Sequence, residues 1–145
     1  MTNISVEGAN GGLHTNYKGK AEAAVKALTE DGFDFVYVHI EAPDEMGHQG
    51  SYEKKVQAIQ YIDENVVKYV VEKLEGKGIE FRLLLLPDHP TPVRIRTHAS
   101  DPVPYMLYDS TRKREESWNY NEREAKENGI YTEEGYKLIE HLFEK

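Results

Sequence analysis

The chain has 145 residues, a length that fits one domain with a single hydrophobic core, and we expect 1–145 to form one domain. Its net charge of -8 argues against a nucleic-acid backbone as the main partner, and no apolar run reaches the roughly 18 residues of a membrane span. There is no cysteine and no recognisable secretory signal, so disulfides and thiolate catalysis are excluded and the composition favours the cytoplasm.

The hydrophobic pattern predicts strands and helices in alternation. In chain order we expect a strand at 3–8, a helix at 17–31, a strand at 33–40, a helix at 51–76, strands at 81–87 and 104–108, and a helix at 132–145. The helix at 51–76 has the clearest signal, because Ser51 can cap it and apolar residues recur at helical spacing up to Leu74. In the final helix we expect an inward face made by Tyr136, Ile139, Leu142 and Phe143.

The order of these elements predicts an α/β fold with three layers, in which a mostly parallel sheet has helices on both faces. The continuous apolar run at 81–87 is typical of a central parallel strand that is covered on both sides. The basic run at 111–117 is interrupted by acidic residues, and we expect a solvated loop there. In sheets of this kind, ligands gather beyond the carboxyl ends of the strands.

Side chains that bind metals gather in three of the predicted connections. The first connection, a turn after 33–40, contributes Asp44 and His48; the second, directly after 81–87, contributes Asp88 and His89; and the third, before 104–108, contributes His98. If the sheet is parallel, all three lie at one edge and their donors converge. Carboxylate oxygen and imidazole nitrogen together suit zinc, manganese or iron better than calcium, which prefers oxygen alone.

Simpler interpretations of the same residues stay open. An Asp-Gly-His turn is more often only a turn, Asp88 could cap or turn the chain after its strand, and His98 alone carries little information. Arg94 and Arg96 could reach a phosphate or carboxylate near the predicted centre, or they could contact only solvent. The joint placement of the donors in three separate loops is what favours a metal site.

Three segments carry a resemblance to a known family. "EAPDEMGHQG", "LLLLPDHPTP" and "RTHASDPVP", in this order and spacing, resemble the cofactor-independent phosphoglycerate mutases of the archaeal-type branch, within the alkaline phosphatase superfamily. The segments "GANGGLHTNYKGKAEAAVKAL" and "NEREAKENGIYTEEGYKLIEHL" resemble that branch too, so that the similarity covers nearly the whole chain. It implies a partial alkaline-phosphatase-like core, and a phosphorylated three-carbon acid as the family's substrate.

The resemblance implies a role for each metal-binding residue. Asp44, His48 and His98 would hold one ion of a two-metal centre, and Asp88 and His89 would contribute to the other. The family uses two divalent ions, manganese or zinc, which flank the phosphoryl group during transfer. In this chain we expect at most one well-formed site, because the second has only two of its ligands.

The resemblance also shows what differs from the full family pattern. None of Ser5, Ser51, Ser100 and Ser110 sits in a context that matches the family's phosphorylated nucleophile. The chain therefore resembles the C-terminal half of the phosphatase core, and we expect weak or no mutase activity from it alone. An open sheet edge would favour self-association or pairing with a missing N-terminal half.

Two other functions stay open on the sequence. The first is a related metal-dependent phosphatase or phosphotransferase that acts on another small alcohol. The second is a non-catalytic, metal-binding or oligomerising module that turns over no substrate. Whether the chain is an enzyme at all is thus undecided at this stage, and neither a nucleic acid nor a membrane is an expected partner.

Overall fold

The computed structural model describes residues 2–112 and 118–144, which divide into two compact units. The first unit runs up to Gly78 and includes Thr91–Ala99, whereas the second comprises Ile79–Pro90 and the chain from Ser100 onward. The expectation that 1–145 folds as one domain stays a prediction. Most of the solvated loop predicted at 111–117 lies outside the described residues.

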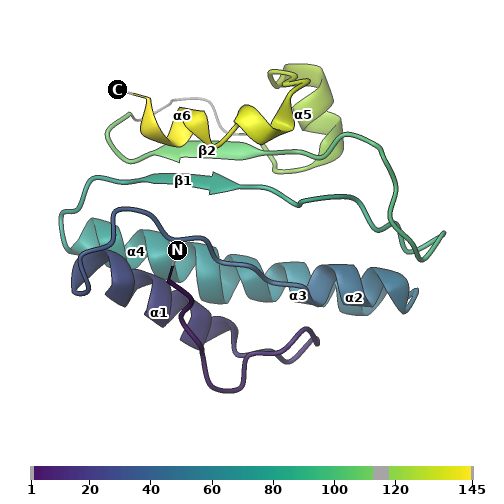
Figure 1. Cartoon of the computed structure of the whole chain (residues 1–145). Helices are drawn as coiled ribbons and strands as arrows, with labels where there is room; N and C mark the ends of the chain where they lie inside the picture. Colours follow the sequence, from purple (N-terminus) through teal and green to yellow (C-terminus); the bar gives the residue numbers. More distant parts are fainter. Residues whose placement is uncertain (1, 113–117, 145) are drawn as a thin grey trace. The chain divides into compact units, whose positions relative to one another are not determined.

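The first unit is built from helices: α1 (Tyr17–Thr29), α2 (Ala42–His48), α3 (Tyr52–Ile62), the π-helical turn η1 (Asp63–Val67) and α4 (Lys68–Gly76). Figure 1 shows α3 and α4 following each other as one long helical stretch, joined through η1. The Ser51 hydroxyl accepts a hydrogen bond from the backbone N–H of Lys54 and caps this stretch. The helix predicted at 51–76 is therefore confirmed.

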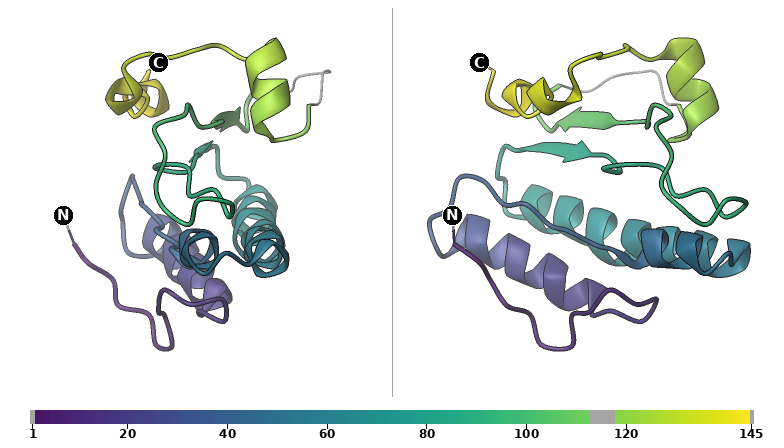
Figure 2. Two further views of the ribbon diagram at one scale, coloured as in Figure 1. Left: turned by 90° about the vertical axis from the view of Figure 1, so that its right-hand side faces the viewer. Right: turned by 45° about the vertical axis from the view of Figure 1, so that its right-hand side comes forward.

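The core of the first unit lies where α1 packs against η1 and α4. The right-hand view of Figure 2 shows α1 running beside this long helical stretch. Ala21 and Ala27 of α1 are fully buried, and Leu74 of α4 is only 1% exposed. Small side chains on α1 let the two helices approach closely around the larger Leu74. The helix predicted at 17–31 is confirmed with an earlier end, at Thr29.

The two strands predicted in the first unit are wrong. Residues 3–8 and 33–40 run without regular secondary structure, apart from turn and bend residues, and the described chain forms no strand there. A strand requires a neighbour that takes up its backbone hydrogen bonds, and an apolar pattern alone cannot supply one. Phe33 and Tyr37 are consequently 36% and 62% exposed.

The second unit contains a two-stranded sheet of β1 (Arg82–Leu85) and β2 (Met106–Asp109). The strands predicted at 81–87 and 104–108 are thus confirmed, with shorter or shifted bounds. They pair antiparallel, with Arg82 opposite Asp109, so the described residues do not form the predicted mostly parallel, three-layer sheet. Parallel neighbours need a long crossover, usually a helix, and the connection between β1 and β2 contains none.

The rest of the second unit contains α5 (Glu122–Asn128), the 3-10 turn η2 (Gly135–Lys137) and α6 (Glu140–Phe143). The final helix predicted at 132–145 is therefore broken into two short pieces. Its predicted inward face is wrong as well, because Tyr136 is 74% and Phe143 59% exposed, whereas Leu138 is buried. No helix among the described residues is long and apolar enough to cross a membrane.

Candidate metal site

Helix α2 places the first two predicted donors on one face. The segment predicted as a turn is helical from Ala42 to His48. Its proline lies in the first helical turn, where the missing backbone N–H costs no helical hydrogen bond. Residues four apart lie above one another on a helix, so Asp44 and His48 are neighbours. The Nε2 atom of His48 is 3.4 Å from Oδ2 of Asp44.

The third donor comes from the segment Thr91–Ala99, which belongs to the same unit. The Nε2 atom of His98 is 3.5 Å from Oδ1 of Asp44 and 3.2 Å from Nε2 of His48. Among the residues that the structure describes, these three form the one group of His, Cys, Asp and Glu with metal-binding proximity. Residues separated by 50 positions in the chain are thus brought to a common point.

The separations within this triangle fit a divalent cation. Nitrogen and oxygen ligands lie about 2.0–2.2 Å from zinc in a tetrahedral site, which separates neighbouring ligand atoms by about 3.4 Å. The two imidazole nitrogens are 3.2 Å apart, and they lie 3.4 and 3.5 Å from the two different carboxylate oxygens of Asp44, Oδ2 and Oδ1. One ligand atom from each of the three residues lies within 4.8 Å of the others, so the carboxylate and the two imidazoles could share an ion.

A backbone carbonyl fixes the imidazole of His48. Nδ1 of His48 lies 3.0 Å from the carbonyl oxygen of Arg96, which can only accept a hydrogen bond, so Nδ1 is the protonated nitrogen. In the neutral ring, Nε2 then has a free lone pair directed towards Asp44 and His98. Arg96 supplies this carbonyl from a left-handed backbone conformation with φ of 57°, which is uncommon for a residue other than glycine.

The triangle is partly open to solvent. The side chains of Asp44, His48 and His98 are 31%, 37% and 54% exposed. Catalytic metal sites keep a position for water or substrate beside three protein ligands, whereas structural sites are closed by a fourth. The exposure and the ligand count therefore both fit a site with an open position.

The other two predicted ligands belong to the second unit. Asp88 and His89 follow β1, and Oδ2 of Asp88 lies 3.5 Å from Nε2 of His89. The backbone N–H of His89 also donates to Oδ1 of Asp88, 3.1 Å away. This pair offers two donors of the correct types, and its role in a second metal site stays a prediction.

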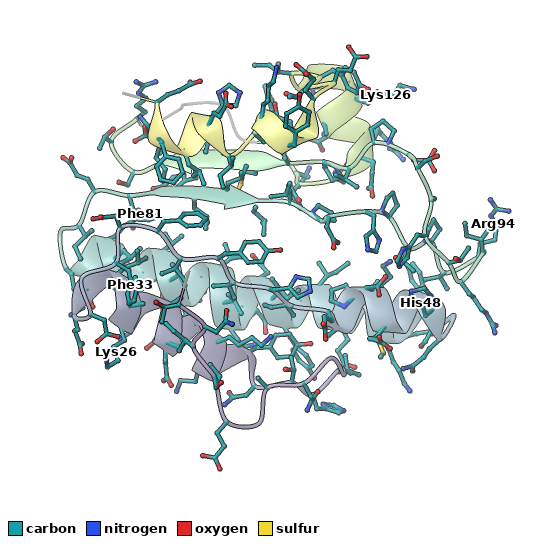
Figure 3. All side chains as sticks on the ribbon, in the orientation of Figure 1. Lys26, Phe33, His48, Phe81, Arg94 and Lys126 are labelled. Carbon is teal, nitrogen blue, oxygen red and sulfur yellow. The ribbon has the colours of Figure 1, made fainter. Side chains whose placement is uncertain are left out.

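The two arginines predicted to bind substrate are both exposed. Figure 3 shows the side chain of Arg94 pointing outward from its loop. The guanidinium of Arg96 covers Gly50, where an added Cβ would lie 2.3 Å from Nε. Arg96 thus contributes to the triangle through its carbonyl oxygen, a contribution that its residue type could not indicate.

A model of the metalloenzyme superfamily matches residues 1–144. The chain belongs to the metalloenzyme superfamily. This membership agrees with the donor chemistry of the triangle, because the family's name refers to bound metal and the three donors are typical ligands of divalent transition metals.

Relatives in this superfamily carry a more specific name. The chain is 42% identical over 143 residues to a probable 2,3-bisphosphoglycerate-independent phosphoglycerate mutase of Geobacter sulfurreducens, covering 98% of this chain and 35% of that protein. It is 47% identical over 139 residues to the 2,3-bisphosphoglycerate-independent phosphoglycerate mutase of Methanothrix thermoacetophila, covering 96% and 35%. The chain therefore spans about a third of the length of the curated relatives it matches.

A solved structure of another protein is similar in fold to this chain. The PH0037 protein from Pyrococcus horikoshii matches with a TM-score of 0.84 and 26% sequence identity, over 97% of this chain and 41% of that one. The fold is thus the alkaline-phosphatase-like fold of the metalloenzyme superfamily, represented here by helices and a small two-stranded sheet.

Proposed function

We propose that the chain is part of the catalytic core of a metal-dependent, cofactor-independent phosphoglycerate mutase, which interconverts 2- and 3-phosphoglycerate. The observation that supports this best is the triangle of Asp44, His48 and His98, in a chain whose relatives are named as such mutases. A divalent ion at the triangle would neutralise charge on a phosphoryl group during its transfer. Because phosphoglycerates are intermediates of glycolysis, we propose the cytoplasm as the compartment.

Manganese and zinc are the proposed ions. Both accept one carboxylate and two imidazoles, and availability in the cell decides between metals with similar preferences. Asp88 and His89 are proposed to contribute two ligands to a second ion. Since they offer only two donors, the second site would be weaker in this chain than the triangle.

The chain offers fewer candidate residues for substrate binding and phosphoryl transfer than for metal binding. Arg94 and Arg96 are proposed to contact the phosphate or carboxylate of the substrate, because a guanidinium binds both in a bidentate manner. No nucleophile is proposed among Ser5, Ser51, Ser100 and Ser110. We therefore propose that these 145 residues alone have weak or no mutase activity.

The finer architecture is also a proposal. We propose that the mostly parallel, three-layer sheet of the phosphatase core forms when further strands add to the elements described here. The exposed aromatic residues Phe33 and Tyr37 would then be covered. In the isolated chain the same exposed groups would favour self-association.

The test is to measure binding of Mn²⁺ and Zn²⁺ by isothermal titration calorimetry to the parent chain and two variants. His98→Ala removes one donor of the triangle and is expected to abolish binding over the range in which the parent binds. His39→Ala is a matched control, because His39 belongs to the same unit and its side chain is similarly exposed, at 49% against 54%. This control is expected to bind like the parent.

A coupled assay with 3-phosphoglycerate and added Mn²⁺ then separates the functions. Binding with weak or no isomerisation agrees with the proposal, and rapid isomerisation by the isolated chain would contradict it. Phosphate release would support the related phosphatase instead. If neither ion binds to the parent chain, the metal site and the mutase proposal are both wrong.

A further inference from the structure

The carboxylate of Asp44 is held by a buried threonine that sequence analysis did not single out. Thr91 is only 2% exposed, and its hydroxyl donates a hydrogen bond to Oδ1 of Asp44. An ionised carboxylate can only accept, so the direction of this bond is fixed. A hydrogen bond to a charged acceptor is among the stronger ones in a protein.

This bond fixes how the carboxylate of Asp44 is oriented relative to the two imidazoles. Oδ1 accepts from Thr91 and lies 3.5 Å from Nε2 of His98, whereas Oδ2 lies 3.4 Å from Nε2 of His48. With Oδ1 held, the carboxylate cannot rotate freely about its last side-chain bond. In this orientation Oδ1 faces the imidazole of His98 and Oδ2 faces that of His48.

A lysine from the neighbouring helix holds Thr91 in turn. Nζ of Lys55, on α3, donates to the backbone carbonyl oxygen of Thr91 at 2.6 Å. The ammonium group thus attaches the beginning of the segment Thr91–Ala99 to the first unit. Because His98 lies on this segment, its position depends on how the segment is attached.

Gly47 of α2 leaves the space in which these groups meet. A Cβ at position 47 would lie 2.4 Å from the carbonyl oxygen of Thr91 and 3.1 Å from Nζ of Lys55. Real Cβ atoms do not approach a backbone oxygen so closely, so a larger residue would push the segment away. Thr91, Lys55 and Gly47 together form an arrangement that we name the Thr91 clasp.

We propose that Thr91 and Lys55 are positioning residues of the metal site, and that the Thr91 clasp holds the carboxylate of Asp44 in the orientation in which it faces both imidazoles. The clasp orients a ligand before metal arrives, which is how outer-shell groups raise metal affinity. This inference rests on the proposed metal site at Asp44, His48 and His98. It adds two residues that donate no atom to the ion.

The test compares Mn²⁺ affinity by calorimetry in Thr91→Val, Thr91→Ser and the parent chain. Valine keeps the shape of threonine but lacks the hydroxyl, and it is expected to weaken binding by about 10–100-fold. Serine keeps the hydroxyl and is expected to restore affinity to within a few-fold of the parent. Thr29→Val is a matched control, because the buried hydroxyl of Thr29 has no hydrogen-bond partner among the described residues and lies outside the triangle.

Circular dichroism and thermal unfolding without metal separate positioning from folding. Weakened binding in a Thr91→Val variant that folds like the parent supports the proposal, whereas unchanged affinity overturns it. If Thr91→Val does not fold, Lys55→Met decides: reduced affinity supports the clasp and unchanged affinity overturns it. If the parent itself binds no Mn²⁺, the proposed function has failed, a result distinct from a parent that binds and variants that bind equally well.

Discussion

Gly47 is the residue of α2 at which an added side chain would meet Thr91 and Lys55. Substituting alanine for a glycine inside a helix normally stabilises it by about 0.5–1 kcal/mol. At position 47 the new Cβ would lie 2.4 Å from the carbonyl oxygen of Thr91. We therefore expect Gly47→Ala to lower the free energy of unfolding by about 1–3 kcal/mol, as overpacking does. Urea denaturation monitored by circular dichroism measures this change.

Gly76 provides the control for this substitution. It lies at the end of α4, and a Cβ added there would meet no atom within 4 Å. Gly76→Ala is expected to be neutral or to stabilise the chain by about 0.4–1 kcal/mol. If Gly47→Ala behaved in the same way as Gly76→Ala, the close contact with Thr91 would be refuted.

At the scale of residues, the donors were predictable and their supports were not. Asp44, His48 and His98 belong to residue types that commonly bind metals, and the resemblance to a family placed them in one centre. Thr91 acts through a hydroxyl and Arg96 through its backbone carbonyl. Any residue has that carbonyl, so no pattern of side chains indicates it.

At the scale of elements, an ion pair between Arg82 and Asp109 joins β1 to β2. Nε of Arg82 donates to Oδ2 of Asp109 at 3.0 Å, directly across the pair of strands. The side chain and backbone N–H of Thr111 donate to the same carboxylate, and together with Arg82 they lower the pKa of Asp109 from 3.8 to about 2. The charged form is the one that the folded sheet stabilises.

A pH dependence follows from the direction of this shift. A carboxyl group with a lowered pKa stabilises the folded state above its unfolded pKa of 3.8, and the contribution is lost as the pH falls towards about 2. We expect the free energy of unfolding of Asp109→Asn to fall less steeply than that of the parent between those two values. Denaturant titrations at pH 7, 4 and about 2.5 would measure the difference.

Thr111→Val tests the physical cause. It removes the hydroxyl that contributes most to the shift but leaves the carboxylate in place. The pKa of Asp109, followed by its NMR chemical shift, is expected to move up towards its ordinary value. If the pKa stayed at about 2 in this variant, Thr111 would not be its main cause.

The sequence predicted an element correctly where nearby residues determine its structure. It failed where the structure depends on a neighbouring strand. The helix at 51–76 has its own cap and apolar stripe, and it formed as expected. The segment at 33–40 has strand-like residues, but strand formation depends on a neighbour that the described chain does not provide. Helix α5 was missed because its residues are polar on all sides and give no amphipathic pattern.

At the scale of the whole molecule, three of the five donors expected to converge lie together, but by a different route. The prediction relied on parallel strands that end at one sheet edge. In the structure, Asp44 and His48 meet because they are four residues apart on α2. His98 reaches them because the chain leaves the first unit at Ile79 and returns to it at Thr91. The types and spacing of the three ligands in the sequence therefore predicted the site better than the expected parallel sheet did.

The distribution of the ligands between units leads to a prediction for the whole chain. An ion bound by Asp44, His48 and His98 stabilises the state that contains the triangle, by about 2.7 kcal/mol when its concentration is 100 times the dissociation constant. Hydrogen–deuterium exchange with and without Mn²⁺, followed by mass spectrometry, is expected to show slower exchange in 44–50 and 91–98. Strand β2 and helix α5 carry none of the three ligands and are expected to change less.

Exchange at 86–90 distinguishes one ion from two. Protection confined to 44–50 and 91–98 would show that the triangle alone binds Mn²⁺, as its three donors predict. A comparable gain in protection at 86–90 would show that Asp88 and His89 also bind Mn²⁺. The Asp88→Asn variant should then lose the protection at 86–90 and keep the rest. Slower exchange only outside all these segments would contradict the site, because bound metal must protect the backbone that carries its ligands.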